Sequence, residues 1–183
     1  MSDPAPRQVL PHSVDALKLC QQRAVVSGFV SLAMLPRLSA QLHTVEGSAF
    51  AELAFGVDEQ SRRILTGRVT ALLPLVCQRC LEGIAITVES EPALALVWND
   101  EQASHLPRSL DPVLLESPEL DLYTIVEDEL LLAMPLVAHH ESGTCVAPPL
   151  NIEQPDLDQD DDEKENPFQV LASLKSVVKD ADN

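Results

Sequence analysis

The chain has 183 residues, enough for one domain of ordinary size with tails or for two very small domains. Its net charge is -17 with a pI near 4.4, which is unsuited to clamping nucleic-acid phosphates or anionic membranes and better suited to holding a basic partner. Aromatic residues make up only 3%, too few for a surface that stacks single-stranded bases.

The N-terminal part predicts a lead-in followed by a short helix. Residues 1–12 contain three prolines and no apolar stretch of signal-peptide type, so we expect an irregular segment there. A single domain is then expected over residues 13–150. Ser13 is a suitable N-cap for a helix, and Cys20 falls on the apolar side of that helix, where a buried, inert thiol is the favoured interpretation.

Residues 25–97 alternate between apolar and polar side chains, which is typical of strands. Short turns separate the alternating runs, one of them at residues 58–61, and such a succession predicts an antiparallel meander or a barrel-like sheet. Pro74 cannot donate to a ladder, so we expect it at an edge or a bulge. With the helices on either side, the fold class is α+β, with two to three helices around this sheet.

A second helix is predicted to begin after Asp121, which can cap it, and to end at Pro135. Apolar residues recur at helical spacing between these two positions. Its polar face carries three consecutive acids, Glu127, Asp128 and Glu129. Because consecutive residues on a helix point in different directions, we expect a solvated face there and no convergent acid–base site. The longest apolar run, residues 130–138, contains a proline and is too short to span a bilayer.

The C-terminal part is strongly acidic and then amphipathic. Residues 153–165 contain eight acids and one lysine, so we expect residues 151–165 to be a disordered linker. Residues 166–179 predict a short helix that begins with an Asn-Pro pair. Its apolar side would contact either its own domain, which is the commoner arrangement, or a partner. The apolar candidates for this contact are Phe168, Leu171 and Leu174.

Cys77 and Cys80 form a C-x-x-C motif between two predicted strands. The motif is compatible with half of a metal site, with a redox pair or with two free thiols. A tetrahedral zinc site needs two more ligands, and His140 and Cys145, five residues apart, are suitable. A thioredoxin-like redox role is disfavoured because that motif begins a helix in a βαβ unit. We expect a cytoplasmic protein, where thiols stay reduced and disulfides are disfavoured.

Four of the twelve basic residues lie within a stretch of 18 positions, on the same predicted hairpin. They could form a phosphate-contacting patch, or they could pair with acids on neighbouring strands, and pairing is the favoured interpretation. The four residues are Arg62, Arg63, Arg68 and Arg79.

The sequence gives no positive evidence for catalysis. It contains no Gly-rich phosphate loop, no H-E-x-x-H motif and no G-x-S-x-G motif. No residue pattern nominates a nucleophile with its base. We therefore expect a protein that is not an enzyme and has no small-molecule substrate.

The order of these motifs resembles a known bacterial family. The C-Q-R-C turn precedes a V-E-D-E-L-L-L-A-M-P helix and a His/Cys loop, and an acidic spacer leads to N-P-F-x-x-L-x-x-L-K. From about residue 9 to Lys175, this pattern resembles the YceD family, the large ribosomal RNA subunit accumulation proteins. Many members have a richer C-P-x-C-G cluster after the long helix, whereas only Cys145 remains here, with His140 upstream.

The resemblance implies a role in synthesis, processing or stability of large-subunit ribosomal RNA. In many bacteria the gene of this family lies beside that of a small basic ribosomal protein. The expected partner is therefore a basic ribosomal protein or a large-subunit precursor particle, held by an acidic surface. The alternative is direct rRNA binding through the four arginines.

Overall fold

The structure is a computed structural model that describes residues 8–141 and residue 145. The predicted acidic linker and C-terminal helix, with Phe168, Leu171 and Leu174, lie outside the described residues. The strands are β1 (Ser13–Asp15), β2 (Val25–Ser31), β3 (Ser48–Val57), β4 (Arg63–Val76), β5 (Gly83–Ser90), β6 (Ala93–Val97), β7 (Asp111–Leu114) and β8 (Glu119–Asp121). The helices are α1 (Ala16–Gln22), the 3-10 helix η1 (Leu32–Met34), α2 (Pro36–Ser39), α3 (Asp100–Ser104) and α4 (Leu122–Ala133).

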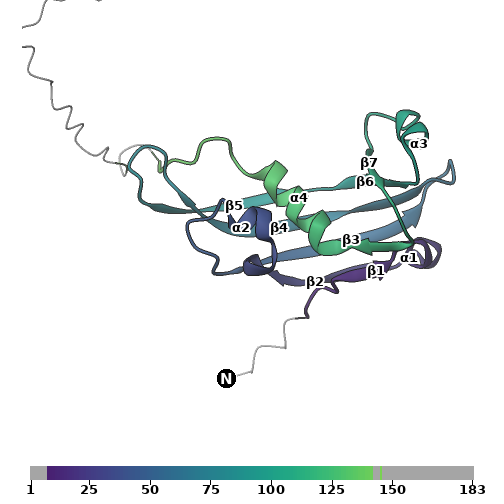
Figure 1. The fold of residues 1–183 in the computed structure, drawn as a ribbon, viewed down its shortest axis with the longest axis horizontal. Coiled ribbons are helices and arrows are strands. Elements are labelled where there is room, and N and C mark those ends of the chain that lie inside the picture. Colours follow the sequence, from purple (N-terminus) through teal and green to yellow (C-terminus); the bar gives the residue numbers. More distant parts are fainter. Residues whose placement is uncertain (1–7, 142–144, 146–183) are drawn as a thin grey trace, which may run out of the picture. The chain divides into compact units, whose positions relative to one another are not determined.

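The long strand β4 organises the larger sheet, which has the order β2-β3-β4-β6-β7 with β5 also paired to β4 (Figure 1). One edge of β4 pairs with β3, and the other pairs first with β6 and then with β5. These pairs and β2–β3 are antiparallel, whereas β6 and β7 are parallel. The predicted α+β class with a mostly antiparallel sheet is confirmed, and the sheet does not close into a barrel. The parallel strand β7 and the short helices α2 and α3 were not predicted.

Pro74 lies where β4 has a strand partner on one side. The β3 ladder ends at Ala71, whereas the β5 ladder continues through Pro74. The carbonyl of Pro74 accepts a hydrogen bond from the His43 N–H at 2.8 Å. It therefore points to the edge of β4 that β3 no longer covers. The nitrogen of a strand residue points to the same side as its carbonyl, so no ladder bond is lost. The predicted edge position is confirmed.

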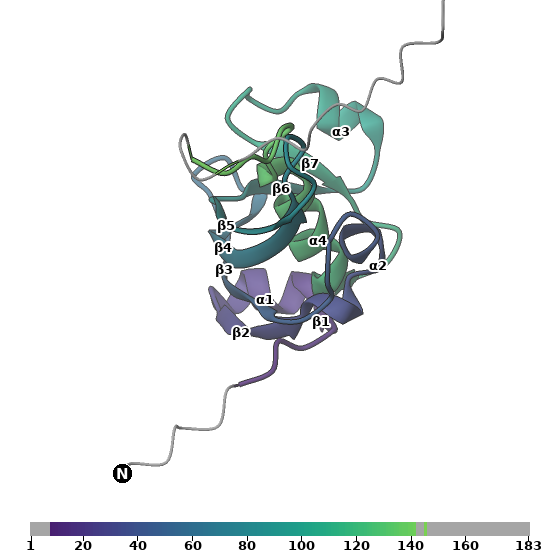
Figure 2. The ribbon, with the colours of Figure 1, turned by 90° about the vertical axis from the view of Figure 1, so that its left-hand side faces the viewer.

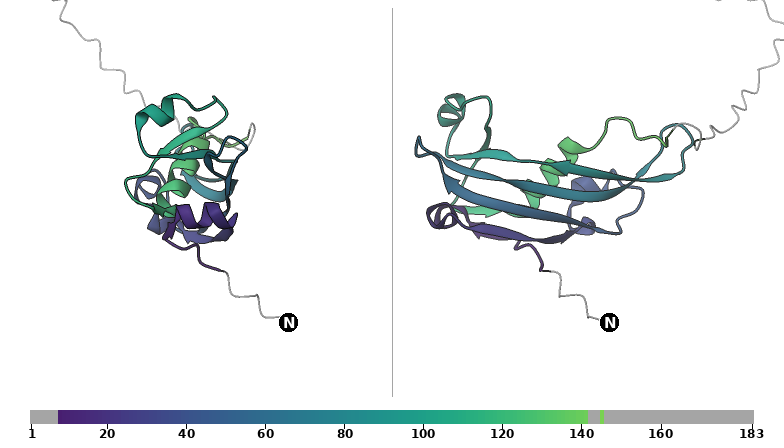
Figure 3. Two further views of the ribbon diagram at one scale, coloured as in Figure 1. Left: turned by 90° about the vertical axis from the view of Figure 1, so that its right-hand side faces the viewer. Right: turned by 180° about the vertical axis from the view of Figure 1, so that it is seen from behind.

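Helix α4 and helix α2 pack on one face of this sheet (Figures 1 and 2). Seen from behind, the strands lie in front of α4 (Figure 3). The core between these layers is aliphatic and includes Ala51, Leu53, Leu65, Val69, Leu73, Leu122, Val126 and Leu130. Alternate residues of β3 and β4 supply the sheet side, as period-two spacing requires.

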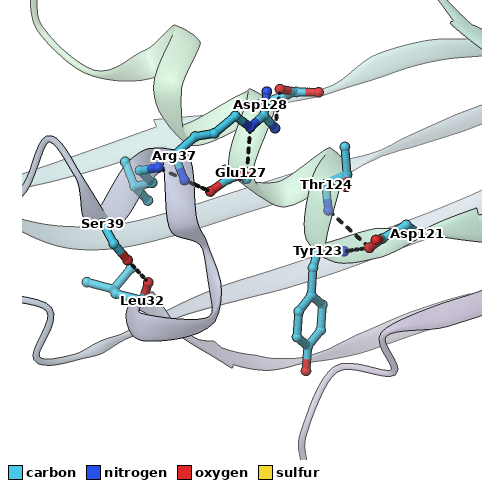
Figure 4. A network of polar contacts seen from close by, with 9 residues as sticks. Leu32, Arg37, Ser39, Asp121, Tyr123, Thr124, Glu127 and Asp128 are labelled. Atoms are coloured by element: carbon cyan, nitrogen blue, oxygen red, sulfur yellow. Dashed lines mark hydrogen bonds and ion pairs between the residues drawn. The ribbon is translucent and has the colours of Figure 1, made fainter.

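The two principal helices begin at capping aspartates. Asp121 accepts hydrogen bonds from the Tyr123 and Thr124 N–H groups at 2.8 and 3.1 Å (Figure 4), which confirms the predicted start of α4. The predicted Ser13 cap is wrong, because residues 13–15 pair with β8 as strand β1 and Asp15 caps α1 instead. Cys20 is fully buried, as predicted. No helix in the described part of the chain has the length and apolarity needed to cross a membrane.

Replacing Asp121 by alanine is expected to lower the free energy of unfolding by about 1 kcal/mol, the usual cost of losing an N-cap. The cause is the loss of an acceptor for two N–H groups that the helix itself cannot satisfy. Urea unfolding followed by circular dichroism measures the change. Asp121→Asn keeps an acceptor oxygen and should recover most of the loss, and equal losses in both variants would contradict the capping role.

The expectation that the acids of α4 form a solvated face is wrong for Glu127. Its side chain is buried, with 4% of the residue exposed. It accepts hydrogen bonds from the Arg37 and Leu38 N–H groups at 2.7 and 3.1 Å and from the Arg37 Nε at 2.8 Å (Figure 4). Asp128 remains partly exposed and pairs with Arg37. Glu127 is buried because it contacts α2, and the spacing of residues along α4 cannot predict such a tertiary contact.

Candidate metal centre

A tight turn over residues 77–82, here called the cysteine turn, joins β4 to β5. The Cys77 N–H donates to the Glu82 carbonyl at 2.8 Å, and the Leu81 N–H donates to the Cys77 carbonyl at 2.9 Å. Leu81 closes the turn in the left-handed region, with φ of 65°. The turn therefore holds Cys77 and Cys80 close together at one end of the sheet.

The segment that follows α4, residues 134–141, reaches this turn (Figures 1 and 3). The Gln78 N–H donates to the Ala138 carbonyl at 2.8 Å, and Gln78 Nε2 donates to the Leu136 carbonyl at 3.4 Å. Ala138 is buried and belongs to the core. Pro135 ends the helix. The residues after it extend to the cysteine turn and place His140 beside Cys80.

The four residues predicted as metal ligands lie together. Cys77 Sγ lies 3.7 Å from Cys145 Sγ, and Cys80 Sγ lies 3.3 Å from His140 Nδ1. Their four ligand atoms all lie within 4.8 Å of one another. We call this set, Cys77, Cys80, His140 and Cys145, the cysteine–histidine cluster. It has the residue types and the proximity that binding a metal ion requires.

The hydrogen bonds of His140 fix the tautomer of its ring. Nε2 lies 3.3 Å from the carbonyl oxygen of Gly83. A carbonyl only accepts, so Nε2 carries the proton and donates to it. In the neutral ring this leaves the lone pair on Nδ1, the atom that faces Cys80. The imidazole is thus oriented to offer Nδ1 as a ligand.

The thiols of the cluster differ in their affinity for a proton. Burial alone would raise the pKa of Cys77, but hydrogen bonds from the backbone of Cys80, Arg79 and His140 outweigh it and lower the pKa to about 5. Burial, together with hydrogen bonds to Cys80 and Cys77, raises the pKa of Cys145 to about 11. These backbone groups therefore favour the thiolate form of Cys77, whose sulfur lies 3.7 Å from that of Cys145.

The four arginines do not gather on one surface. Arg62 pairs with Asp58 at 2.6 Å, as the pairing interpretation predicted. Arg68 pairs with Glu89 at 2.7 Å and with Glu91 at 3.5 Å. Arg63 begins β4 and Arg79 lies beyond its end, so about 45 Å of strand separates them at 3.3 Å per residue.

A groove that sequence reasoning missed lies between β7, β8 and the start of α4. It has a volume of about 720 Å³. Its lining combines aliphatic side chains with the carboxylates of Glu116, Glu119, Asp121 and Asp128. Glu119 and Asp121 belong to β8, Glu116 lies in the loop after β7 and Asp128 lies in α4, so the groove depends on how these elements pack. The one sequence signal was the acidic content of residues 116–121.

Comparison with known proteins places the chain in a family. Residues 65–175 match the family model described as "Large ribosomal RNA subunit accumulation protein YceD". A relative from Haemophilus influenzae with the same description is 38% identical over 167 residues, which cover 91% of this chain and 96% of the relative. No solved structure matches. The matched region contains the cysteine turn, α4 and the whole cysteine–histidine cluster, and the chain belongs to the YceD family.

Proposed function

We propose that this protein is a non-catalytic ribosome-biogenesis factor that supports the accumulation of large-subunit ribosomal RNA in the cytoplasm. The observation that carries the proposal is the match to the rRNA accumulation family over most of the chain. The finer proposal is that it holds a basic ribosomal protein or a precursor particle and that rRNA accumulates because assembly protects it.

Charge supports a basic protein partner. The net charge of the chain is -17, and the groove described above offers four carboxylates beside aliphatic side chains. Basic segments of ribosomal proteins carry cationic groups on long apolar stems, which match both features. The cysteine–histidine cluster enters this proposal as a structural element of the domain and not as a catalytic centre.

Direct rRNA binding through the four arginines is the alternative. Two observations weigh against it: Arg62 and Arg68 are paired with carboxylates, and the ends of β4 separate Arg63 from Arg79. A gel-shift titration of the full chain with precursor rRNA distinguishes the two routes. Salt-sensitive RNA affinity that Arg63→Ala and Arg79→Ala abolish would favour the alternative.

The full chain is expected to co-sediment with large-subunit precursors from growing cells at physiological salt. Replacing Glu116 and Glu119 together by lysine should weaken binding to a basic ribosomal protein at least tenfold, because the groove loses its charge complementarity. Gradient sedimentation and titration calorimetry measure the two effects.

A matched control changes the same amount of charge elsewhere. Glu46 and Glu59 are exposed loop residues outside the groove, and replacing both by lysine should have a much smaller effect. Equal losses in the two double variants would show that total charge matters and the groove does not. A wild-type protein that neither co-sediments nor binds a basic ribosomal protein contradicts the proposed function.

A further inference from the structure

We propose that the cysteine–histidine cluster binds one Zn²⁺ ion, which fastens the cysteine turn to the segment after α4. The ligands would be Cys77, Cys80 and Cys145 through Sγ and His140 through Nδ1. This inference stands on the geometry and chemistry of the cluster and does not depend on the proposed function.

Two distances between ligand atoms are close to the edges of a tetrahedron around zinc. Zinc binds sulfur at about 2.3 Å and nitrogen at about 2.0–2.1 Å, so two sulfur ligands stand about 3.8 Å apart and a sulfur and a nitrogen about 3.5 Å apart. The Cys77–Cys145 sulfur pair lies at 3.7 Å, and the Cys80 sulfur lies 3.3 Å from His140 Nδ1. Small side-chain adjustments are enough to admit the ion.

The donor set selects the metal. Three thiolates and one imidazole are soft or borderline ligands, which favour zinc and disfavour magnesium and calcium. Four protein ligands complete a tetrahedron and leave no open position, as in structural zinc sites. Three thiolates with a neutral imidazole leave a net charge of about -1 on the loaded site, which the neighbouring backbone N–H groups can stabilise.

The ligand side chains already have hydrogen-bond partners that would orient them around the ion. The Gly83 carbonyl accepts from Nε2 of His140, the contact that orients a metal-binding histidine in most sites. Backbone hydrogen bonds from Arg79, Cys80 and His140 reach the sulfur of Cys77. These contacts come from both the cysteine turn and the segment after α4, so the supporting groups belong to the same two elements that the ion would join.

The ion would add a strong link to the hydrogen bonds that already join these two elements. Gln78 supplies two hydrogen bonds between the cysteine turn and residues 134–141, and His140 adds its bond to Gly83. Cys77 and Cys145 are 68 positions apart in the chain. A bridge over so long a loop removes much conformational freedom from the unfolded chain. Zinc would therefore hold residues 134–141 and Cys145 against the end of the sheet.

A disulfide between Cys77 and Cys145 is the competing state. Their sulfurs stand at 3.7 Å, whereas a bonded pair stands at about 2.05 Å. A disulfide would also leave the Cys80–His140 contact without a role, whereas zinc uses all four residues. Intact-mass measurement distinguishes them, because a disulfide removes two hydrogens from the mass and zinc dissociates on denaturation.

The test measures zinc in the full chain, purified without a metal-binding tag in the presence of a reductant and reconstituted with zinc. We expect one zinc per chain by elemental analysis. Cys80→Ala and His140→Ala should lower zinc affinity at least a hundredfold in competition with a chromogenic chelator. Cys20→Ala and His139→Ala are matched controls, because they remove the same residue types outside the cluster, and they should retain zinc.

Two measurements on the unaltered chain keep the test decisive if a variant fails to fold. Cobalt substitution should give the intense visible absorption of a tetrahedral site with thiolate ligands. Added zinc should slow alkylation of Cys77, Cys80 and Cys145 at least tenfold. Failure to bind added zinc, equal alkylation with and without it, equal zinc loss in His139→Ala and His140→Ala, or a disulfide mass under reducing conditions would each overturn the proposal.

Discussion

Replacing Gly67 by alanine is expected to lower the free energy of unfolding by more than about 3 kcal/mol, above the usual range for overpacking. A Cβ at this position would lie 2.0 Å from the backbone oxygen of Glu52 and 3.1 Å from the Cα of Leu53. Backbone atoms of a neighbouring strand cannot move aside as a flexible side chain can. The central β3–β4 ladder would have to separate locally, and urea unfolding measures the cost.

Gly56 provides a matched control in the same pair of strands. A Cβ there would meet Ile64 at 3.8 Å, an ordinary van der Waals contact. Gly56→Ala should therefore change stability by less than about 1 kcal/mol and could raise it by restricting the unfolded chain. Similar losses in both variants would show that strand propensity, and not the close approach of β3, limits position 67.

The result for Gly67 also bears on the candidate metal centre. Strand β4 begins at Arg63 and ends at Val76, immediately before Cys77. Its pairing with β3 anchors the strand from which the cysteine turn projects. Gly67→Ala should therefore weaken the whole domain, whereas changes to His140 should act at the end of the sheet and on zinc affinity.

Glu127→Ala is expected to lower the free energy of unfolding by about 2–4 kcal/mol, because it leaves one buried and one partly buried N–H group without an acceptor. Leu35 stands at the N-cap of α2 and has no side chain that can cap it. The carboxylate of Glu127, from α4, accepts from the Arg37 and Leu38 N–H groups in its place. One carboxylate thus caps α2 and fixes it on α4. Urea unfolding monitored by circular dichroism checks the loss.

The neighbouring acid supplies the control for this prediction. Asp128 pairs with the same arginine at 2.8 Å, but both side chains are about half exposed. Water can replace that contact, so Asp128→Ala should cost less than about 1 kcal/mol. Glu127→Gln keeps one acceptor oxygen and should fall between the two alanine variants. A cost for Asp128→Ala as large as that for Glu127→Ala would contradict the capping role.

Elements governed by local chemistry were predictable from the sequence. The start of α4 follows from the side chain of Asp121, and its end follows from Pro135, because capping and the proline ring act within one turn. The strands β3 and β4 follow from alternation, which reports a half-buried sheet whatever its partners are. Cys77 and Cys80 could be paired because only two residues of a turn separate them.

Distant pairings were harder to predict from the sequence. His140 and Cys145 could be nominated as ligands from residue type and their spacing to each other, but only the packing of α4 brings them to the cysteine turn. The alternation of apolar and polar residues also could not show that β6 pairs with a parallel strand. Parallel and antiparallel strands give the same alternating pattern. The Ser13 cap failed because residues 13–15 pair with β8, more than 100 positions away.

The sequence by itself determined the α+β class, the main helix, the acidic character and the identity of the four cluster residues, since each depends on residue type or short spacing. The tertiary structure alone decided that Glu127 is buried, that the four arginines do not gather on one surface and that four carboxylates share one groove. It also decided that the four sulfur and nitrogen atoms of the cluster converge within 4.8 Å. Convergence and burial depend on contacts between segments far apart in the chain, and these contacts arise only when the helices pack on the sheet.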